Sequence, residues 1–237
     1  MHNFYCPDIL SSLELSEEES AHAVRVLRLS AGDTIRIFDG NGHIYMAIIE
    51  HAHAKHTKIR ITETVFVPKN RNYRIHIAIA PTKNADRLEW FVEKACEIGV
   101  DRITPLICRY SERKNSKTER LQKIIIAAIK QSQQAYLPLL DEATPFDKLM
   151  GMLDNEQRFI AHCYDDQTKI ELADMCEENK DVVIAIGPEG DFSEEEVNIA
   201  IRNNFKAVAL GKNRLRTETA GVVATHTIHV LNQLKRN

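Results

Sequence analysis

The sequence predicts an α/β protein whose main domain is a parallel sheet with helices on both faces, and three observations support this fold class. Short apolar runs rich in branched residues, such as Val182–Ile186 and 207–210, alternate with amphipathic segments of helical period. The N-terminal residues instead carry several short strand-like runs. The polar stretch 68–72 separates the two patterns. We therefore expect one domain over residues 1–70 and a second, with the parallel sheet, over residues 73–237.

The first domain is predicted to be a small β-rich module. Residues 16–29 predict a helix with an acidic first turn, and Arg25 and Arg28 lie on the side away from its apolar residues. Strands are expected at Thr34–Phe38, 44–49 and 56–67, and the first two flank a DGNG turn, which is a strong hairpin signal. Several short strands with little helix indicate a small barrel.

The second domain is predicted to alternate strands with helices. Its strands are expected at 74–80, 103–108, 159–163, Val182–Ile186 and 207–210. Its helices are expected at Ala85–Ile98, after a capping box at Ser116 and Glu119, near 170–177, after a capping box at Ser193 and Glu196, and over Thr217–Leu234. Gly99 is predicted to end the first of these helices in the left-handed conformation.

Two glycine turns directly follow two of the predicted strands. Gly187 and Gly211 each end a short buried run. In an open α/β sheet, ligands bind beyond the carboxyl ends of the strands. The motifs GxGxxG and GxxxxGK[ST] are both absent, so the common nucleotide sites are not indicated. The two turns predict one small-molecule pocket, with Arg216 and Glu218 at its mouth.

Composition places the chain among ordinary soluble globular proteins. Of its 237 residues, 43% are hydrophobic and 27% charged. No apolar run approaches the roughly 20 residues that span a bilayer, and the N-terminus lacks a signal-peptide pattern. The five cysteines form no CxxC pair, and HExxH is missing although there are ten histidines. We expect a cytoplasmic protein with no membrane contact and no metal site, in which Cys96 and Cys163 are buried free thiols.

The net charge of −3 conceals an uneven distribution. Residues 71–130 hold thirteen Lys and Arg against seven Asp and Glu, whereas residues 141–196 hold four against seventeen. Only the first region can follow a phosphate backbone. Solvated helix faces explain many of its lysines, but they explain the arginines at strand ends less well.

The residues around the glycine turns resemble a known family. GPEGDFSEEE, which begins at Gly187, and LGKNRLRTETA, which begins at Leu210, are similar to motifs of the ribosomal RNA small subunit methyltransferase E family of the SPOUT superfamily. The resemblance covers nearly the whole chain. HAVRVLRLSAGDTIRIFDGNG resembles that family's RNA-binding module, and DRLEWFVEKACEIGVDRITPL resembles its first strand–helix–strand unit. One departure is Asp191, which stands where family members commonly carry a third glycine.

The resemblance implies a fold and an activity. The fold is a SPOUT-type parallel sheet with a C-terminal trefoil knot, in which residues 211–217 pass through the preceding loop, joined to a PUA-like N-terminal β-barrel. The activity is methylation of N3 of one uridine in 16S ribosomal RNA, dependent on S-adenosyl-L-methionine (SAM). Periodicity alone cannot show a knot, and threaded chains are rare.

Together with the chemistry of the reaction, the resemblance implies site residues. The cofactor residues are expected to be His162, Gly187, Gly190, Leu210, Gly211, Leu215 and Thr217. The RNA-binding residues are expected to be Arg25, Arg28, Lys83, Arg87, Arg109 and Arg113.

Three further residues are the catalytic candidates. Uracil N3 carries a proton at neutral pH, so the site has to stabilise the deprotonated ring and accept a proton. Arg216 suits the first task, because a guanidinium can bind the O2 or O4 oxygen. Glu218 and Glu189 are candidates for the second. Glu218 is equally well explained as a first-turn carboxylate stabilised by the helix dipole, and Arg216 can alternatively be half of an ion pair.

The expected partners are 16S ribosomal RNA within the small subunit and a second copy of the chain. The last helix has an apolar stripe of Ala220, Val223, Leu231 and Leu234, with further apolar residues outside it, Val222, Ile228 and Val230. One stripe suffices to dock a helix on its own sheet, so the remainder favours a homodimer.

Two alternatives to this enzyme stay open. A non-catalytic RNA-binding ribosome assembly factor is expected to lose residues such as Gly187, Gly211 or Arg216, all of which are present. A SPOUT enzyme that acts on transfer RNA is excluded only by the resemblance of the N-terminal module.

Overall fold

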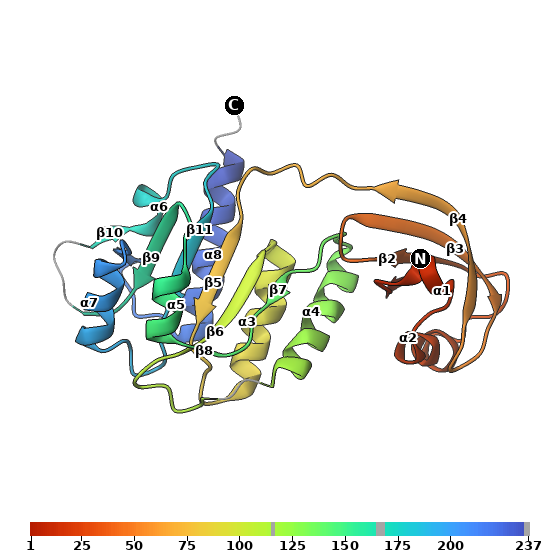
Figure 1. Cartoon of the computed structure of the whole chain (residues 1–237), viewed down its shortest axis with the longest axis horizontal. Helices are drawn as coiled ribbons and strands as arrows, with labels where there is room; N and C mark the ends of the chain where they lie inside the picture. Colours follow the sequence, from red (N-terminus) through yellow and green to blue (C-terminus); the bar gives the residue numbers. More distant parts are fainter. Residues whose placement is uncertain (115–116, 165–168, 235–237) are drawn as a thin grey trace. The chain divides into compact units, whose positions relative to one another are not determined.

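The computed structural model describes residues 1–114, 117–164 and 169–234, and it divides into two compact units (Figure 1). The first unit is Met1–Asn70 with Ile126–Leu137, and the second is Arg71–Ile125 with Pro138–Asn237. The predicted capping box at Ser116 and Glu119 lies outside the described residues, because Ser116 is not among them.

The segment Ile126–Leu137 belongs by contact to the first unit, although the sequence assigns it to the second domain. The Tyr136 hydroxyl donates to the carbonyl of Val67 at 2.9 Å. Lys130 Nζ forms an ion pair with Glu19 at 2.7 Å. Helical periodicity reports which side of a helix is apolar but not which unit that side meets, so the sequence could not predict this packing.

The first unit contains a four-stranded sheet in the order β1-β2-β3-β4. The strands are β1 (Asn3–Tyr5), β2 (Thr34–Phe38), β3 (His43–His51) and β4 (Lys58–Phe66). β1 is parallel to β2, and the other two pairs are antiparallel. The predicted hairpin is confirmed, and its turn places Gly40 and Gly42 at φ of 82° and 100°, which glycine adopts readily. A short helix, α1 (Ile9–Ser12), precedes it.

The helix predicted over 16–29 is shorter and irregular. Ser16 caps α2 (Glu17–Ala21) by accepting a hydrogen bond from the backbone N–H of Glu19, and a π-helical turn, η1 (His22–Val26), follows. Arg28 has a φ of 58°, which ends the helix. Apolar spacing does not reveal a single widened turn, and so the sequence predicted a regular helix. Arg25 and Arg28 are both exposed.

The second unit contains a parallel sheet in the order β10-β12-β9-β11-β5-β6-β7, with β8 paired to β6. Its strands are β5 (Ile75–Ile79), β6 (Arg102–Ile107), β7 (Leu139–Leu140), β8 (Thr144–Pro145), β9 (Gln157–Ala161), β10 (Ile170–Glu171), β11 (Val182–Ile186) and β12 (Lys206–Ala209). Their described pairings are parallel. The predicted α/β class is therefore confirmed.

Helices cover both faces of this sheet. α3 (Ala85–Ile98) and α8 (Thr217–Leu234) pack on each other, and α8 also contacts β5 and β11. α5 (Phe146–Met152) packs on α7 (Glu194–Arg202), and both contribute to a core cluster that includes Ala78 and Ala185. Residues of β5 alternate between the faces, so Ile79 meets α8 while Ala78 meets the opposite layer.

Local signals predicted several element ends correctly. Gly99 ends α3 in the left-handed conformation with φ of 108°, and Ser193 and Glu196 form the expected capping box at α7. α4 (Thr118–Ser132) follows the undescribed pair of residues. The helix predicted near 170–177 is wrong over its first residues: β10 is followed by the short α6 (Leu172–Met175).

The buried side of α8 differs from the predicted apolar stripe. It is formed by Gly221, Ala224 and Ile228 together with polar residues, whereas Leu234 is 71% exposed. A Cβ on Gly221 would lie only 2.6 Å from the ring of Phe91, so the glycine permits α8 to approach α3 closely. Small residues decide the packing here, and a pattern that weights large apolar residues misplaces the inward side.

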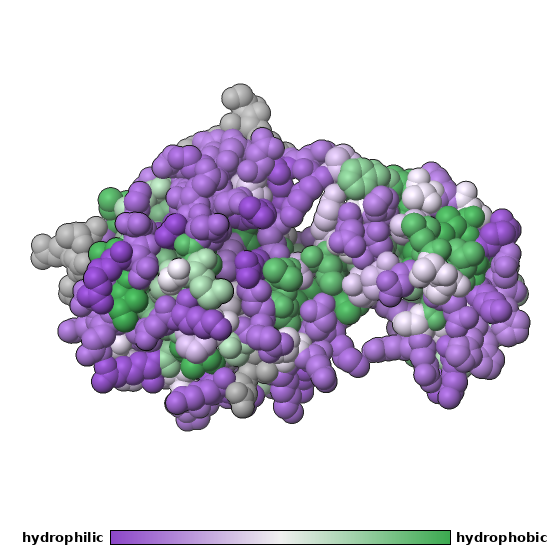
Figure 2. Space-filling view, in the orientation of Figure 1, coloured by the Kyte–Doolittle hydropathy of each residue, from purple (hydrophilic) through white to green (hydrophobic). Residues whose placement is uncertain are grey.

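No helix within the described residues has both the length and the apolar character needed to cross a membrane. Figure 2 shows a mainly hydrophilic surface on the face in view, with hydrophobic residues gathered in limited patches.

Candidate active site

The loops after three neighbouring strands meet at one edge of the second unit's sheet. β9 pairs in parallel with β12 on one side and with β11 on the other. The loops that follow them begin at His162, Gly187 and Leu210. The strand order thus places the two glycine turns on either side of the loop after β9.

Two adjoining cavities, together called the crevice below, lie between these loops and the first turn of α8. Their volumes are about 300 and 320 Å³. Both are lined by Ala161, Cys163, Arg214, Leu215 and Ala220. Six of the seven residues predicted for the cofactor line one or both of them: His162, Gly187, Leu210, Gly211, Leu215 and Thr217.

Three glycines of these loops are favoured, two by tight packing and one by its backbone conformation. A Cβ on Gly187 would lie 3.1 Å from the ring of Phe192, which is fully buried. A Cβ on Gly190 would lie 3.1 Å from the Cβ of Tyr110, so Gly190, the seventh predicted residue, faces a packing contact. Gly211 has φ of 105° and open space around it, so its backbone conformation requires glycine and its position leaves room in the crevice.

Asp191 replaces the expected third glycine without changing the conformation that glycine would supply. Its φ is 66°, in the left-handed region. Its two carboxylate oxygens accept hydrogen bonds from the backbone N–H groups of Phe192 at 2.8 Å and Cys163 at 2.7 Å. The second bond ties the loop after β11 to the loop after β9. Thr217 Oγ1 connects the start of α8 to the loop after β11 by donating a hydrogen bond to the carbonyl of Gly187 at 3.0 Å.

Cys163 is exposed, so the prediction that it is buried is wrong, whereas Cys96 is buried as predicted. Partial burial and the Asp191 carboxylate both raise the pKa of the Cys163 thiol. A neutral thiol is therefore favoured beside the crevice. Among the described residues, no group of three His, Cys, Asp or Glu side chains is arranged to hold a metal ion.

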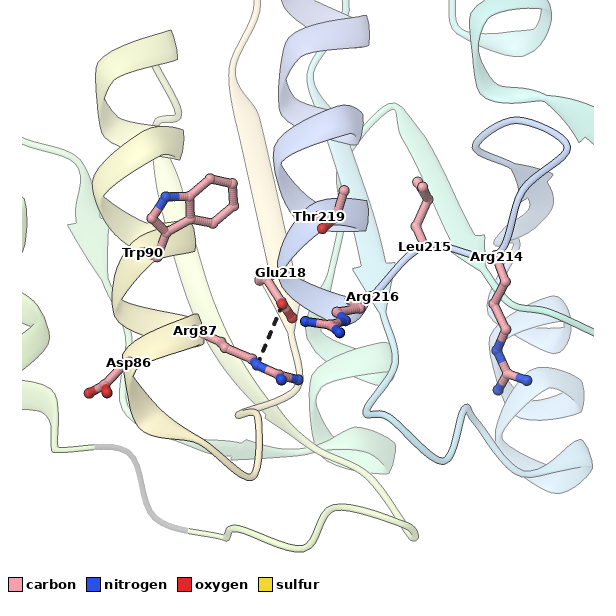
Figure 3. A pocket seen from close by; sticks show the side chains of 8 residues that line it. All are labelled: Asp86, Arg87, Trp90, Arg214, Leu215, Arg216, Glu218 and Thr219. Carbon is pink, nitrogen blue, oxygen red and sulfur yellow. Dashed lines mark ion pairs between the residues drawn. The ribbon is translucent and has the colours of Figure 1, made fainter.

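A third cavity of about 600 Å³, called the α3–α8 cavity below, adjoins the crevice (Figure 3). It shares Arg214, Leu215 and Arg216 with the crevice. α3 contributes Asp86, Arg87 and Trp90 to its lining, and the start of α8 contributes Glu218 and Thr219. In Figure 3, Arg87 and Arg216 extend toward Glu218, whereas Arg214 points away from it.

Glu218 is the buried carboxylate of this cavity. The residue is 7% exposed, and its Oε1 lies 3.8 Å from Nε of Arg87. Its Oε2 is buried without a hydrogen-bond partner among the described residues. A buried carboxylate oxygen without a partner is costly, so an acceptor is held ready at this point.

Glu189, the other candidate base, is exposed and already engaged. It lines the crevice, and its Oε1 accepts a hydrogen bond from the backbone N–H of Lys83 at 3.0 Å. This geometry fits a residue that stabilises the loop better than it fits a free proton acceptor.

The residues predicted to bind RNA belong to both units. Arg87 lines the α3–α8 cavity. Lys83 pairs with Glu112 at 2.9 Å, and Arg109 pairs with Glu195. Arg113 lines a separate small cavity with Lys117 and Arg120. Arg25 and Arg28 belong to the first unit and are exposed there.

Trp90 is one of several lining residues that the sequence did not predict, along with Lys169, Lys212 and Arg214. The buried side of α3 consists of Leu88, Phe91, Val92, Ala95 and Cys96. Trp90 lies off that side and is 44% exposed. A large aromatic residue outside the apolar stripe of α3 was the available signal, but single exposed apolar side chains are common and do not by themselves mark a site.

Comparison with protein families identifies both parts of the chain. Residues 69–229 match the model of an RNA methyltransferase domain, and residues 15–62 match an RNA methyltransferase PUA domain. A ribosomal RNA small subunit methyltransferase E from Rickettsia conorii is 29% identical over 93% of this chain and 91% of its own length.

Solved structures agree with these matches. A probable rRNA-methyltransferase from Porphyromonas gingivalis is 41% identical, covers both chains fully and has a TM-score of 0.93. A putative methyltransferase from Legionella pneumophila, solved with its bound cofactor SAM, is 30% identical over 96% of each chain with a TM-score of 0.88. A ribosomal RNA small subunit methyltransferase E from Neisseria gonorrhoeae, bound to S-adenosyl methionine, is 26% identical over 98% of each chain with a TM-score of 0.86. Because the RNA methyltransferase model covers more than half of the sequence and these relatives span almost all of it, the chain belongs to the ribosomal RNA small subunit methyltransferase E family.

Proposed function

We propose that this protein transfers the methyl group of SAM to N3 of a uridine in 16S ribosomal RNA of the small subunit. The main observation that supports the proposal is the crevice, because six of the residues predicted to bind the cofactor line it. Family membership supports the activity, and two of the solved relatives hold SAM. The acceptor atom and the small-subunit context rest on the resemblance and on the chemistry argued below.

The residues of the crevice suit a nucleoside joined to an amino acid. The walls near β12 include Val208, Ala209 and Leu215, which offer apolar contact to a flat ring. The backbone groups of Leu210 and Leu215 are available for the edge of an adenine, with His162 on the border. Lys169, Lys212 and Arg214 line the same cavity and suit a carboxylate. When bound, SAM supplies an electrophilic methyl group, whose bond to sulfur breaks as the bond to N3 forms and a neutral thioether leaves.

The start of α8 suits the acceptor. Arg216 lines both the crevice and the α3–α8 cavity, so its guanidinium can stabilise negative charge on a uracil oxygen. The carboxylate of Glu218, which lines the α3–α8 cavity, is the proposed acceptor of the N3 proton. The helix dipole alone does not account for Glu218, because a carboxylate held only by the dipole gains nothing from burying an unpartnered oxygen.

We also propose a homodimer, a trefoil knot and a cytoplasmic location. Val223, Val230 and Leu231 of α8 stay half-buried within one chain, and this apolar surface supports the dimer. Light scattering tests it: a mass near one 27.0 kDa chain with full activity on dilution contradicts the dimer. The knot is supported only by the resemblance and the family.

Calorimetric titration with SAM tests the cofactor site. Ala220 lines both cavities of the crevice from the first turn of α8, so Ala220→Leu should fill it and weaken SAM binding at least about tenfold. Val222→Leu, two residues further along the same helix, is the matched control and should bind as the wild type does. A wild-type protein that does not bind SAM contradicts the proposed function. Equal affinity in Ala220→Leu places the cofactor elsewhere.

A further inference from the structure

The α3–α8 cavity has a lining that the cofactor does not need. Trp90 presents an indole that is 44% exposed, beside the guanidinium groups of Arg87 and Arg216 and the buried carboxylate of Glu218 (Figure 3). The cavity adjoins the crevice through Arg214, Leu215 and Arg216. A ligand in the α3–α8 cavity is therefore a neighbour of a ligand in the crevice.

Each feature of this lining matches one property of a nucleobase. An indole face stacks on any base, and such stacking is a common means of holding an unpaired nucleotide. Arginine binds ring oxygens and can also stack on the ring. The carboxylate of Glu218, which lines the cavity, is an acceptor for a ring N–H group. Uracil offers all three: a flat face, two carbonyl oxygens and the N3–H group between them.

We infer that the α3–α8 cavity receives the acceptor uracil, extruded from its strand and stacked on Trp90. N3–H then points to the carboxylate of Glu218, and the two carbonyl oxygens lie within reach of Arg87 and Arg216. This assignment rests on the proposed function, since it names where the acceptor of that reaction is held. An enzyme that modifies a base atom engaged in pairing has to remove the base from its helix.

Arg87 acquires a specific task under this assignment. Its Nε lies 3.8 Å from Glu218 Oε1, and both residues line the cavity. Arg87 is therefore a positioning residue for the carboxylate, and it is the one residue predicted to bind RNA that lies in this cavity.

A second copy of the chain is the competing occupant. Asp86, Arg87, Arg214, Arg216 and Glu218 make the lining strongly charged. Covering it with an apolar helix would remove these charges from water, which is unfavourable even for a paired charge such as Arg87 with Glu218. A base with its own polar edge satisfies them, so the observations favour the nucleotide.

Trp90 is the only tryptophan in the sequence, so fluorescence excited selectively at tryptophan, rather than at the six tyrosines, reports on this cavity. The test titrates an oligouridylate, and an abasic oligomer of equal length and charge, into the protein saturated with S-adenosylhomocysteine. The base-bearing RNA should quench Trp90, because stacking brings the base against the indole, and the abasic RNA should not. Equal responses to both oligomers overturn the assignment, whether or not SAM binds and methyl transfer occurs.

Two variants make the test quantitative. Trp90→Phe keeps an aromatic face and should keep methyl transfer within about threefold, whereas Trp90→Leu should raise KM for the RNA roughly tenfold or more with SAM affinity unchanged. Ile201→Ala, at a large hydrophobic residue that is 46% exposed on α7, is the matched control and should have little effect. The assignment is wrong if Trp90→Leu keeps the wild-type KM. It is also wrong if the loss of activity in Trp90→Leu is explained by a change of oligomeric state, which light scattering measures. Failure of the wild type to bind SAM is a separate result, which contradicts the proposed function instead.

Discussion

At the scale of single residues, two carboxylates compete for the role of base, and their surroundings separate them. Glu218 is buried with one unpartnered oxygen, whereas Glu189 is exposed and accepts a backbone hydrogen bond from Lys83. Glu218→Gln preserves the shape of the side chain but cannot take a proton. Steady-state kinetics should show kcat lower by about a hundredfold to ten-thousandfold with SAM affinity unchanged.

Glu189→Gln is the matched variant for that measurement. An amide oxygen still accepts the Lys83 N–H bond, so kcat should stay within about threefold of the wild type. The reverse pattern, with Glu189→Gln inactive and Glu218→Gln active, contradicts the assignment of Glu218.

The residue scale also shows how far sequence reasoning reaches into a site. The glycine turns and six of the crevice residues were predictable, because strand ends in a parallel sheet meet at one edge. The sequence showed that Asp191 stands where the family commonly has a glycine, but it did not predict what the aspartate side chain contacts. Its side-chain bond to the N–H of Cys163 depends on a loop that is remote in the sequence. Trp90 was missed because its significance comes from α8, which the pattern of α3 does not contain.

At the scale of elements, the contact between α3 and α8 depends on one small residue. Gly221 lies within a helix, where alanine is normally favoured by up to about 1 kcal/mol. A Cβ there would lie 2.6 Å from the ring of Phe91 and 2.9 Å from Ile79, both of them fully buried. Gly221→Ala should therefore lower the free energy of unfolding, by about 1–3 kcal/mol in denaturant titration.

Gly151 provides the control for this prediction. It lies in α5, and a Cβ there would meet nothing within 4 Å. Gly151→Ala should leave stability unchanged or raise it by up to about 1 kcal/mol. An increase in the free energy of unfolding of Gly221→Ala would contradict this prediction, because it would show that α3 and α8 can move apart without losing stability.

The pairing of β5 with β6 encloses a histidine that makes stability depend on pH. His76 is 3% exposed, its Nε2 lies 2.7 Å from Thr104 Oγ1, and that hydroxyl donates to Asp141. Burial, and secondarily the charge of Arg102, lower its pKa to about 4, against the opposing effect of Asp141. Because the folded-state pKa is below that of the unfolded chain, near 6.5, stability is full above about pH 6.5 and falls as the pH drops toward 4.

The loss from this residue should reach about 3 kcal/mol at pH 4. Denaturant titrations between pH 7 and about 4 measure it. His76→Gln retains an N–H donor for Thr104 but does not titrate, so its stability should depend less on pH over this interval. If the free energy of unfolding depends on pH identically in both proteins, other groups cause the loss of stability in acid.

The sequence predicts where helices begin and end better than it predicts how they pack. The ends of α3 and the capping box of α7 were predicted because a glycine or a serine–glutamate pair acts within a few residues. The π-helical turn at His22–Val26 and the buried side of α8 were not, because both are decided by the neighbours that a helix meets.

At the scale of the whole molecule, the two units have separate expected tasks, with RNA contact in the first and chemistry in the second. Arg25 and Arg28 are exposed in the first unit and remain predicted phosphate contacts. Replacing both with alanine should weaken binding of ribosomal RNA and reduce the slope of log affinity against log salt by roughly 1 to 2. SAM affinity should not change.

Lys148→Ala with Lys180→Ala is the charge-matched control, because both residues lie in the acidic region 141–196. The salt slope of this control should match the wild type. If the two double variants behave alike, the first unit does not contact the phosphate backbone through these arginines.

The most direct measurement of the central claim is methyl transfer from labelled SAM to small ribosomal subunits that lack base methylation, with the modified nucleoside identified by mass and chromatography. The account predicts label in 16S ribosomal RNA, recovered as 3-methyluridine, with Glu218→Gln giving a large loss of product under the same conditions. Label that appears only in transfer RNA, or in a nucleoside other than 3-methyluridine, would contradict it, as would SAM binding without any transfer of label.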